Sequence, residues 1–186
     1  MLAYSETQAR ALAELDAVIG RSRLPSFADL PQLPYIRAMV KEALRWSPLS
    51  PSGPPHQTTE DDWYEGTFIP KGTVCISNVW HLNRDPEIFG KNPEHFDPMR
   101  YLDTSENAAP GVSEIKERGH FTYGFGRRIC VGRYMADNAL FINIAVLLWA
   151  AEIGRKEDAS GSFVPLDLDG WVDGGLAVLV VFVTNR

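Results

Sequence analysis

Apolar side chains near the start of the chain recur with the spacing of an amphipathic helix. The apolar positions on its inner face are Leu12, Leu15 and Ile19. Ser5 is followed three residues later by Gln8, a spacing that predicts a capping box at the beginning of this helix. Gly20 is placed to end it. The chain therefore begins with a predicted helix from Ser5 to about Gly20.

A second amphipathic pattern predicts a helix from Pro34 to Trp46, reached through a polar connector at residues 21–34. Pro48 follows closely, and a proline cannot continue a helix. The positions expected to face inward are Ile36, Val40, Ala43 and Leu44.

The middle of the chain is rich in turn signals. Glu65-Gly66 predicts a hairpin turn, and residues 74–79 are expected to form a strand in which Cys75 is buried. A short helix is predicted to start at residues 87–89. Residues 103–120 are polar and irregular, which indicates a surface loop.

The last third changes from helical to strand patterns. Residues 132–153 are apolar on nearly all sides, which predicts a helix buried between layers. Its most apolar part, residues 139–153, is shorter than the roughly 20 residues that a membrane-spanning helix needs. Residues 163–183 predict β hairpins that end in a run of strand-forming residues. The expected fold class is mainly α with small β-sheets.

Composition narrows the class of protein. The 186 residues suffice for one domain with its own core. The net charge of −6 argues against nucleic acid as a main partner. Two cysteines form no disulfide framework, and we expect both to be reduced in an intracellular setting. The N-terminus lacks the long apolar stretch of a signal peptide.

Residues 121–132 read F-T-Y-G-F-G-R-R-I-C-V-G and concentrate the candidate chemistry. The groups that matter are Gly124, Gly126, Arg127, Arg128 and Cys130. Glycine backbone can pass close to a flat ligand, and arginines bind acidic groups. The two arginines and the helix start that follows favour the cysteine thiolate. Together these features suggest a haem whose iron is held by that thiolate.

Other kinds of site fit this loop less well. An isolated cysteine is more often a small buried residue than a ligand. The third glycine of a dinucleotide loop is missing, and no G-K-[ST] motif follows. A zinc site is excluded because no second cysteine or histidine lies at ligand spacing. A thiol enzyme that uses Cys130 has no histidine at an obvious partnering distance in the sequence, although a spatial neighbour stays open.

The loop resembles the haem-binding loop of the cytochrome P450 family in the run Tyr123-Gly124-x-Gly126-x-Arg128-x-Cys130-x-Gly132. At Tyr123 the family usually has phenylalanine, and the tyrosine hydroxyl needs a hydrogen-bond partner. At Val131 many eukaryotic relatives have proline. Neither departure removes the expected iron ligand.

Glu42 and Arg45 form an E-x-x-R pair on one helix face, where the carboxylate can hold the guanidinium with two hydrogen bonds. Such pairs are usually solvated, but these two resemble the family's E-x-x-R helix. The segment Pro98-x-Arg100-Tyr101 resembles its P-E-R-F segment, with Met99 in place of the acid. The resemblance implies a buried, structural ion network of Glu42, Arg45 and Arg100.

The resemblance further implies a haem-thiolate monooxygenase with haem b, a small organic substrate and a reductase partner. The implied cofactor-binding residues are Cys130 as axial iron ligand, Arg128 and His56 as propionate donors, and Tyr123, Phe125, Gly124, Gly126 and Gly132 in the loop. Residues 49–53 correspond to a segment that lines the substrate pocket. Lys71 and the two loop arginines are candidates for docking the reductase.

The family's oxygen-activating motif A-G-x-[DE]-T does not occur in the 186 residues, so we expect no catalytic residue here. We interpret residues 1–186 as the C-terminal, proximal part of a cytochrome P450 domain, hence a fragment or a short form. The alternative is a non-catalytic remnant that binds haem weakly or binds only a redox partner. The full-length protein could be anchored in the endoplasmic reticulum membrane, as many eukaryotic relatives are.

Overall fold

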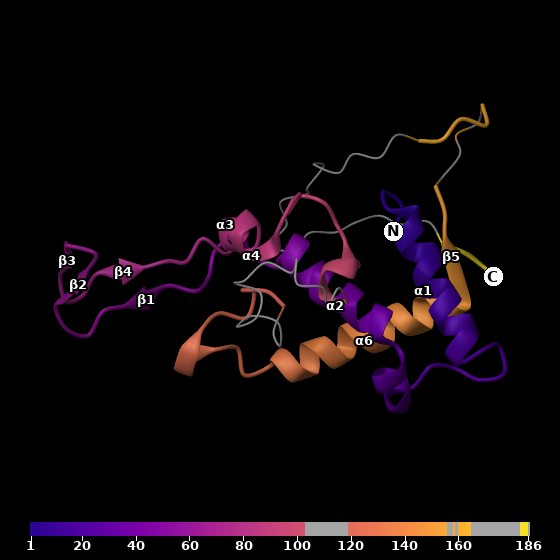
Figure 1. Ribbon diagram of the computed structural model, residues 1–186, viewed down its shortest axis with the longest axis horizontal. Coiled ribbons are helices and arrows are strands. Elements are labelled where there is room, and N and C mark those ends of the chain that lie inside the picture. The colour runs from indigo at the N-terminus through magenta and orange to yellow at the C-terminus, as the bar shows by residue number, and fades with distance from the viewer. Residues whose placement is uncertain (103–118, 156–157, 159, 165–182, 186) are drawn as a thin grey trace.

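The helices α1 (Ser5–Val18), α2 (Pro34–Trp46) and α6 (Arg133–Ala150) pack side by side around one apolar core (Figure 1). The computed structural model describes residues 1–102, 119–155, 158, 160–164 and 183–185. The fully or almost fully buried apolar side chains of the core are Ala11, Leu15, Leu33, Ile36, Met39, Phe141, Ala145 and Leu148. Burying one such large side chain contributes about 1.5–3 kcal/mol, so the packing of these side chains is the main source of stability for the three-helix body of the protein.

The first helix follows the predicted apolar pattern, but the predicted capping box is wrong. Helix α1 begins at Ser5 behind the N-cap residue Tyr4, and no side chain caps it. Gln8 is buried instead, and its amide bonds both backbone groups of Ile153 at 3.1 and 3.0 Å. Because both groups of the Gln8 amide are hydrogen-bonded to the Ile153 backbone, the side chain does not also bond the N-terminus of its own helix.

The predicted helix from Pro34 to Trp46 is confirmed as α2. Its first backbone N–H groups are satisfied from another helix. The carboxylate of Glu14 on α1 accepts hydrogen bonds from the N–H groups of Tyr35 and Ile36, at 2.8 and 3.0 Å. Free N–H groups and the positive end of the helix dipole both favour a carboxylate at this place.

The connector before α2 contains a short 3-10 helix, η1 (Phe27–Gln32), which the sequence pattern did not predict. Ser26 and Asp29 cap it reciprocally. Arg23 binds the same carboxylate at 2.6 Å and, together with the hydrogen bonds from Ser26, holds the pKa of Asp29 well below its ordinary value. The connector is thus an ordered, capped turn, and it places the buried Leu33 in the core.

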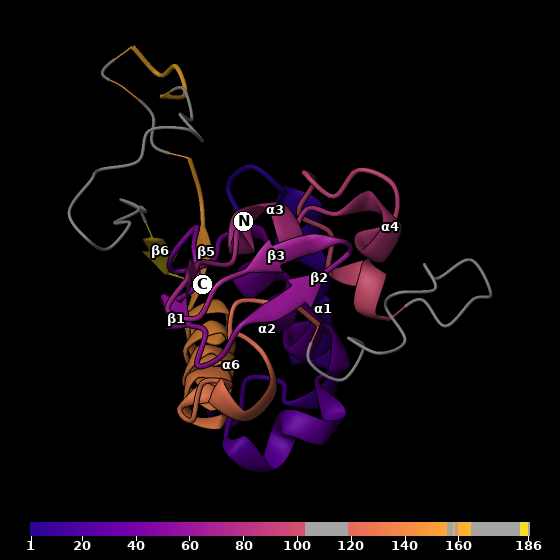
Figure 2. The ribbon, with the colours of Figure 1, turned by 90° about the vertical axis from the view of Figure 1, so that its left-hand side faces the viewer.

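Residues 54–76 form a two-stranded arm that leaves the body, and in Figure 2 it points toward the viewer. Strand β1 (His56–Gln57) pairs antiparallel with β4 (Val74–Cys75), and β2 (Asp62–Tyr64) pairs with β3 (Thr67–Ile69). The predicted turn is confirmed, since Glu65 and Gly66 have φ angles of 47° and 79° between β2 and β3. Both angles are positive, as a tight two-residue hairpin requires.

Two predictions about the end of the arm are wrong. The predicted strand 74–79 has only its first two residues in β4, because the chain then pairs with residues 51–53 and enters α3 (Val79–Leu82). Cys75 was expected to be buried, and it is exposed. A ribbon of two strands has no layer packed on its faces, so both faces remain open to solvent.

Short capped helices follow the arm: α4 (Pro86–Phe89) and the 3-10 helix η2 (Pro98–Tyr101). The α4 helix confirms the prediction of a short helix at residues 87–89, and Asp85 and Asp97 cap the two helices through backbone N–H groups. Of the predicted surface loop 103–120, residues 103–118 lie outside the described part. The last two residues, Gly119 and His120, are buried, so the prediction is wrong for them.

Helix α6 ends at Ala150, three residues before the predicted end, and β5 (Ala151–Ile153) then pairs antiparallel with β6 (Val183–Asn185). The helix is not buried on all sides as predicted: Tyr134, Met135 and Leu147 are exposed. Most of the predicted hairpin region 163–183 lies outside the described residues. Across the described ranges, no helix has both the length and the apolar character to cross a bilayer. The fold is mixed, with helices and small two-stranded sheets, as predicted.

Candidate functional site

The segment of residues 121–132, here called the cysteine loop, is closed on itself by backbone hydrogen bonds just before α6. The N–H of Cys130 donates to the carbonyl of Tyr123 at 2.9 Å. Inside this closure lies a single 3-10 turn, η3 (Gly126–Arg128). Backbone hydrogen bonds within the loop therefore hold Cys130 at a defined place just before α6.

Two glycines give the loop its shape. Gly124 and Gly126 have φ angles of 75° and 55°, in the left-handed region that favours glycine. A Cβ atom added at either position would meet no other heavy atom within 4 Å, so the space beside both is open. Gly132 differs, because its φ is −83° and a Cβ there would lie 3.8 Å from the Cys130 sulfur.

Cys130 is exposed, and so are the neighbouring Arg127 and Arg128. Arg133 donates from its guanidinium to the Cys130 carbonyl at 3.1 Å. Three arginines thus lie within three sequence positions of one accessible thiol in a chain whose net charge is −6. Phe125 is half exposed, and its ring lies 5.4 Å from the ring of Phe121 rather than in the core.

Tyr123 finds the partner that its hydroxyl requires. The hydroxyl donates to Asp137 on α6 at 2.7 Å. Partial burial, followed by the bond to this carboxylate, raises the pKa of Tyr123 above its ordinary value. Because the carbonyl of Tyr123 also accepts the Cys130 N–H, one residue joins the loop, the cysteine and the helix.

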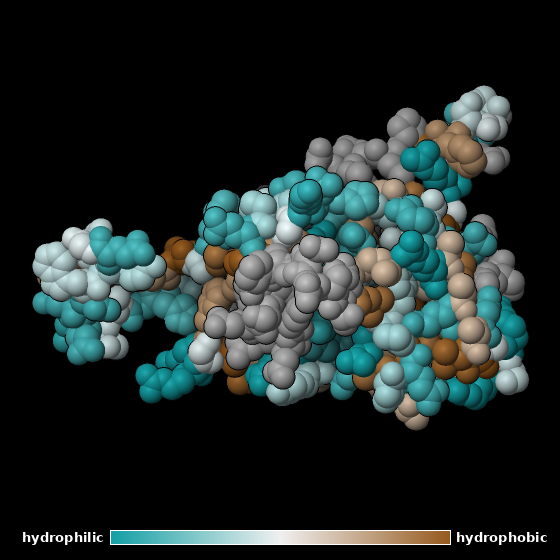
Figure 3. Space-filling view, viewed as in Figure 1, coloured by the Kyte–Doolittle hydropathy of each residue, from teal (hydrophilic) through white to brown (hydrophobic). Residues whose placement is uncertain are grey.

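The other expected cofactor and substrate residues lie on or beside the arm. His56 is exposed on β1, opposite Cys75, and is not part of the cysteine loop. Leu49 is 76% exposed at the base of the arm. There the backbone of residues 51–53 pairs with residues 77–80, as Gly53 N–H donates to the Ser77 carbonyl at 2.9 Å. Figure 3 shows apolar surface where the arm joins the body.

The structure brings Glu42, Arg45 and Arg100 together in a buried cluster, here called the ion network. The Glu42 and Arg45 side chains are 0% exposed and share two hydrogen bonds of 2.7 Å. Arg100 reaches the same carboxylate at 3.2 Å. All described buried side-chain nitrogen and oxygen atoms have a hydrogen-bond partner, this cluster included.

Sequence reasoning missed the residues that connect this network to the cysteine loop. Asn83 is fully buried at the end of α3 and bonds Phe121 and Thr122 at the start of the loop. An asparagine before Arg-Asp-Pro carries a turn signal only, and nothing in the local pattern reveals its long-range partners.

His120 lies beside the loop and is 4% exposed. Its Nδ1 accepts the N–H of Thr122 at 3.2 Å, and its ring lies 4.8 Å from that of Tyr123. Burial, and then the positive charge of Lys41, lower the pKa of His120 to about 4. Its Nδ1 is thus already used by a backbone N–H, which favours a packing role over that of a base for Cys130.

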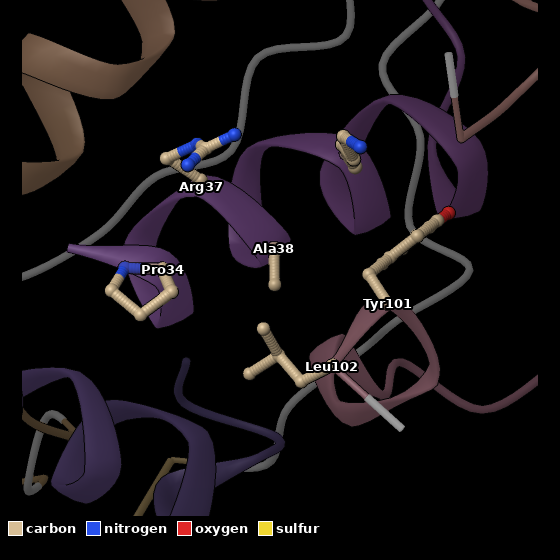
Figure 4. Close-up of a pocket in the computed structure, with 6 residues that line it drawn as sticks. Pro34, Arg37, Ala38, Tyr101 and Leu102 are labelled. Atoms are coloured by element: carbon tan, nitrogen blue, oxygen red, sulfur yellow. The ribbon is translucent and has the colours of Figure 1, made fainter. Parts of the chain in front are cut away.

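A pocket of about 120 Å³ lies between α2 and η2, and no residue of the cysteine loop lines it (Figure 4). It is lined by Pro34, Arg37, Ala38, Lys41, Tyr101 and Leu102. Ligand pockets usually exceed about 300 Å³, so this one is too small for an organic substrate of ordinary size.

No group of three or more His, Cys, Asp or Glu side chains that could hold a metal ion occurs in the described part of the chain. A prosthetic group could supply the other ligands of an iron held by Cys130. The open space beside Gly124 and Gly126 and the exposed thiol fit a flat group of this kind.

Comparison with known proteins adds independent findings. A family model described as Cytochrome P450 matches residues 1–152. A cytochrome P450 monooxygenase of Armillaria gallica is 62% identical over 176 residues, which cover 95% of this chain and 34% of that protein. Cytochrome P450 monooxygenase iboC of Amanita muscaria is 42% identical over 204 residues, with 86% and 36% covered.

Solved structures agree with these sequence relatives. A zebra fish cytochrome P450 structure with abiraterone has a TM-score of 0.78 and 30% identity, and the match covers 100% of this chain and 41% of that chain. The chain spans about a third of the length of the curated relatives that it matches.

Proposed function

The chain belongs to the cytochrome P450 family, and from this premise we propose that it is the thiolate-bearing part of a haem monooxygenase. The observation that carries the proposal is the exposed thiol of Cys130, held by a loop whose glycines leave open space beside it. Cys130 would hold the iron of a haem b through its sulfur.

Each loop group has a role that matches its chemistry. Gly124 and Gly126 let the backbone approach a ring face without a Cβ clash. Arg128 would pair with a haem propionate, because a guanidinium binds carboxylates with two hydrogen bonds.

When bound, a thiolate-ligated haem supplies the activation of O₂ and the insertion of one oxygen atom into an organic substrate. This chain's own contribution is to hold the Cys130 sulfur at a fixed place. Two hydrogen bonds fix the position of Cys130. Its N–H donates to the Tyr123 carbonyl, and the Tyr123 hydroxyl donates to Asp137.

Two further contributions would come from residues on or beside the arm: His56 would contact the haem, and residues 49–53 would contact the substrate. His56 is an exposed imidazole that could donate to a second propionate. Residues 49–53 begin with the exposed Leu49 and would line part of the substrate pocket, which needs apolar surface.

A redox partner with an acidic surface would supply the electrons. Lys71, Arg127 and Arg128 are exposed cations that could steer such a partner. Steering of this kind weakens as the ionic strength rises, so electron-transfer rates should fall with added salt.

The first experiment is titration of the purified chain with haem, followed by the spectrum of the reduced carbon monoxide complex. Cys130→Ala should abolish the red-shifted Soret band that marks thiolate ligation. Cys75→Ala is the matched control, because it removes the other exposed thiol from the arm and should leave the band unchanged. A band that survives in Cys130→Ala would refute the ligand assignment.

The alternative is that the 186-residue chain by itself is non-catalytic and binds haem weakly or binds only a redox partner. The exposure of the cysteine loop favours it, because a haem at Cys130 would be covered by few of the described residues. Absence of specific haem binding by a well-folded chain would support this alternative over an autonomous haem domain.

A further inference from the structure

Asn83 is the buried polar residue through which the cysteine loop is tied to the body. It lies at the C-terminal end of α3 and is 0% exposed. Its side-chain Oδ1 accepts the N–H of Phe121 at 2.8 Å. Its Nδ2 donates to the Thr122 hydroxyl oxygen at 3.0 Å. Both ends of one amide therefore bind the first residues of the loop.

The same residue is joined to α2 by two routes. Its backbone carbonyl accepts a hydrogen bond from Arg45 of the ion network at 2.7 Å. The hydroxyl of Thr122, to which the Asn83 amide donates, itself donates to the Leu44 carbonyl at 2.7 Å. The loop thus begins from a point that α2 and α3 define together.

The chemistry of this point requires an amide. The only proton of the Thr122 hydroxyl is used on the Leu44 carbonyl, so the hydroxyl oxygen can only accept from residue 83. The Phe121 N–H, in contrast, needs an acceptor from the same side chain. Asparagine offers one acceptor and one donor group at this size, whereas aspartate offers acceptors only and leucine offers neither.

We infer that Asn83 is a positioning residue, which fixes the cysteine loop relative to the ion network and thereby sets the place of Cys130. The path from one to the other is short. Thr122 precedes Tyr123, whose carbonyl accepts the N–H of Cys130 at 2.9 Å. A displacement of the loop's first residues therefore passes directly to the cysteine. The part of this inference that concerns iron ligation rests on the proposed function.

The first test measures amide hydrogen exchange in the haem-free chain. In Asn83→Ala, the amides of Phe121 and Cys130 should exchange about 10- to 30-fold faster, since two buried hydrogen bonds of ordinary strength are lost. Exchange in α1 should be unchanged. Asn138→Ala, at an exposed position on α6, is the control and should leave the loop unaffected. An equal increase in all elements, or no increase in the loop, would overturn the inference.

Milder variants keep the test decisive if Asn83→Ala folds poorly. Asn83→Asp has the same shape but places a carboxylate against the Thr122 oxygen, so it should also accelerate exchange in the loop. Thr122→Val removes that oxygen. In the Thr122→Val background the additional effect of Asn83→Asp should shrink, whereas equal effects in both backgrounds would show that the two side chains do not act together.

The second test separates this inference from the proposed function. In the haem-loaded chain, Asn83→Ala should lower the fraction of the carbon monoxide complex with the thiolate-type band, and Asn138→Ala should not. A wild-type chain without that band would favour the alternative given above, in which the chain alone does not bind haem specifically, and the exchange data would still decide whether Asn83 positions the loop. A normal band in a variant whose loop exchanges faster would refute the link to iron ligation.

Discussion

Replacing Arg45 by alanine should be among the most destabilising single substitutions in this protein. Its guanidinium donates two hydrogen bonds to Glu42 and others to the carbonyls of Asn83, Pro93 and His95. Without it, the Glu42 carboxylate stays buried and loses both bonds to its nearest cation, and its partners within the described part of the chain then include Arg100 and the Asp97 N–H. Removing one partner of a buried ion pair costs about 3–5 kcal/mol. Domains of this kind are stable by only about 5–15 kcal/mol, so the loss would be a large part of the total.

Arg100→Ala should cost less, about 1.5–3 kcal/mol, which is the range for the loss of its one bond to the Glu42 carboxylate, since its other two bonds go to the backbone carbonyls of Phe89 and His95. Glu42 keeps both bonds to Arg45 in that variant, and Arg100 is itself slightly exposed, at 12%. Arg45→Lys should fall between the two alanine variants, because lysine keeps the charge but cannot form the two parallel bonds. The predicted order of stability loss is therefore Arg45→Ala, then Arg45→Lys, then Arg100→Ala.

Urea unfolding followed by far-ultraviolet circular dichroism and tryptophan fluorescence measures these losses. Arg23→Ala is the matched control, because Arg23 forms an equally short ion pair with Asp29 but its side chain is 49% exposed. The control should lose far less than Arg45→Ala. An Arg45→Ala loss below about 1 kcal/mol, the range of solvated pairs, would refute the argument that burial makes this network important.

Two further predictions concern groups beside the cysteine. The pKa of His120 is lowered to about 4 in the folded protein, so the unfolded chain takes up a proton at a higher pH than the folded chain. The contribution of neutral His120 to the free energy of unfolding is therefore complete above about pH 6.5 and falls by up to about 3 kcal/mol toward pH 4. His120→Gln should flatten this part of the pH dependence in urea titrations, and an unchanged slope would contradict the assignment. The pKa of Tyr123 is raised, so its contribution is present below about pH 10 and lost at higher pH. Tyr123→Phe should lower the free energy of unfolding at pH 7 by about 1 kcal/mol and should weaken the loss of stability above about pH 10. Thermal unfolding at pH 7 and above about pH 10, with Asp137→Asn for comparison, measures both effects.

Local signals explain what could be predicted. The bounds of α2 follow from its apolar spacing and from prolines at its start and just beyond its end, and the hairpin turn follows from Glu65-Gly66. Each depends on residues a few positions apart, whose relative placement is set by helix or turn geometry. The Glu42–Arg45 pair belongs to this class, since a spacing of three places both side chains on one helix face. The position of Cys130 ahead of a helix also follows from the order of residues alone.

The choice of distant partners was decided only by the tertiary structure. Gln8 bonds Ile153, Glu14 caps α2, and Asn83 holds the start of the cysteine loop. A buried polar group must find a partner, but the sequence does not say which of many backbone groups the topology brings within reach. Cys75 shows the same limit for burial: a strand in which Cys75 is buried was predicted, and a two-stranded arm has no inner face. Local order thus determined the main helices and the hairpin turn, and packing determined which side chains meet and which stay exposed.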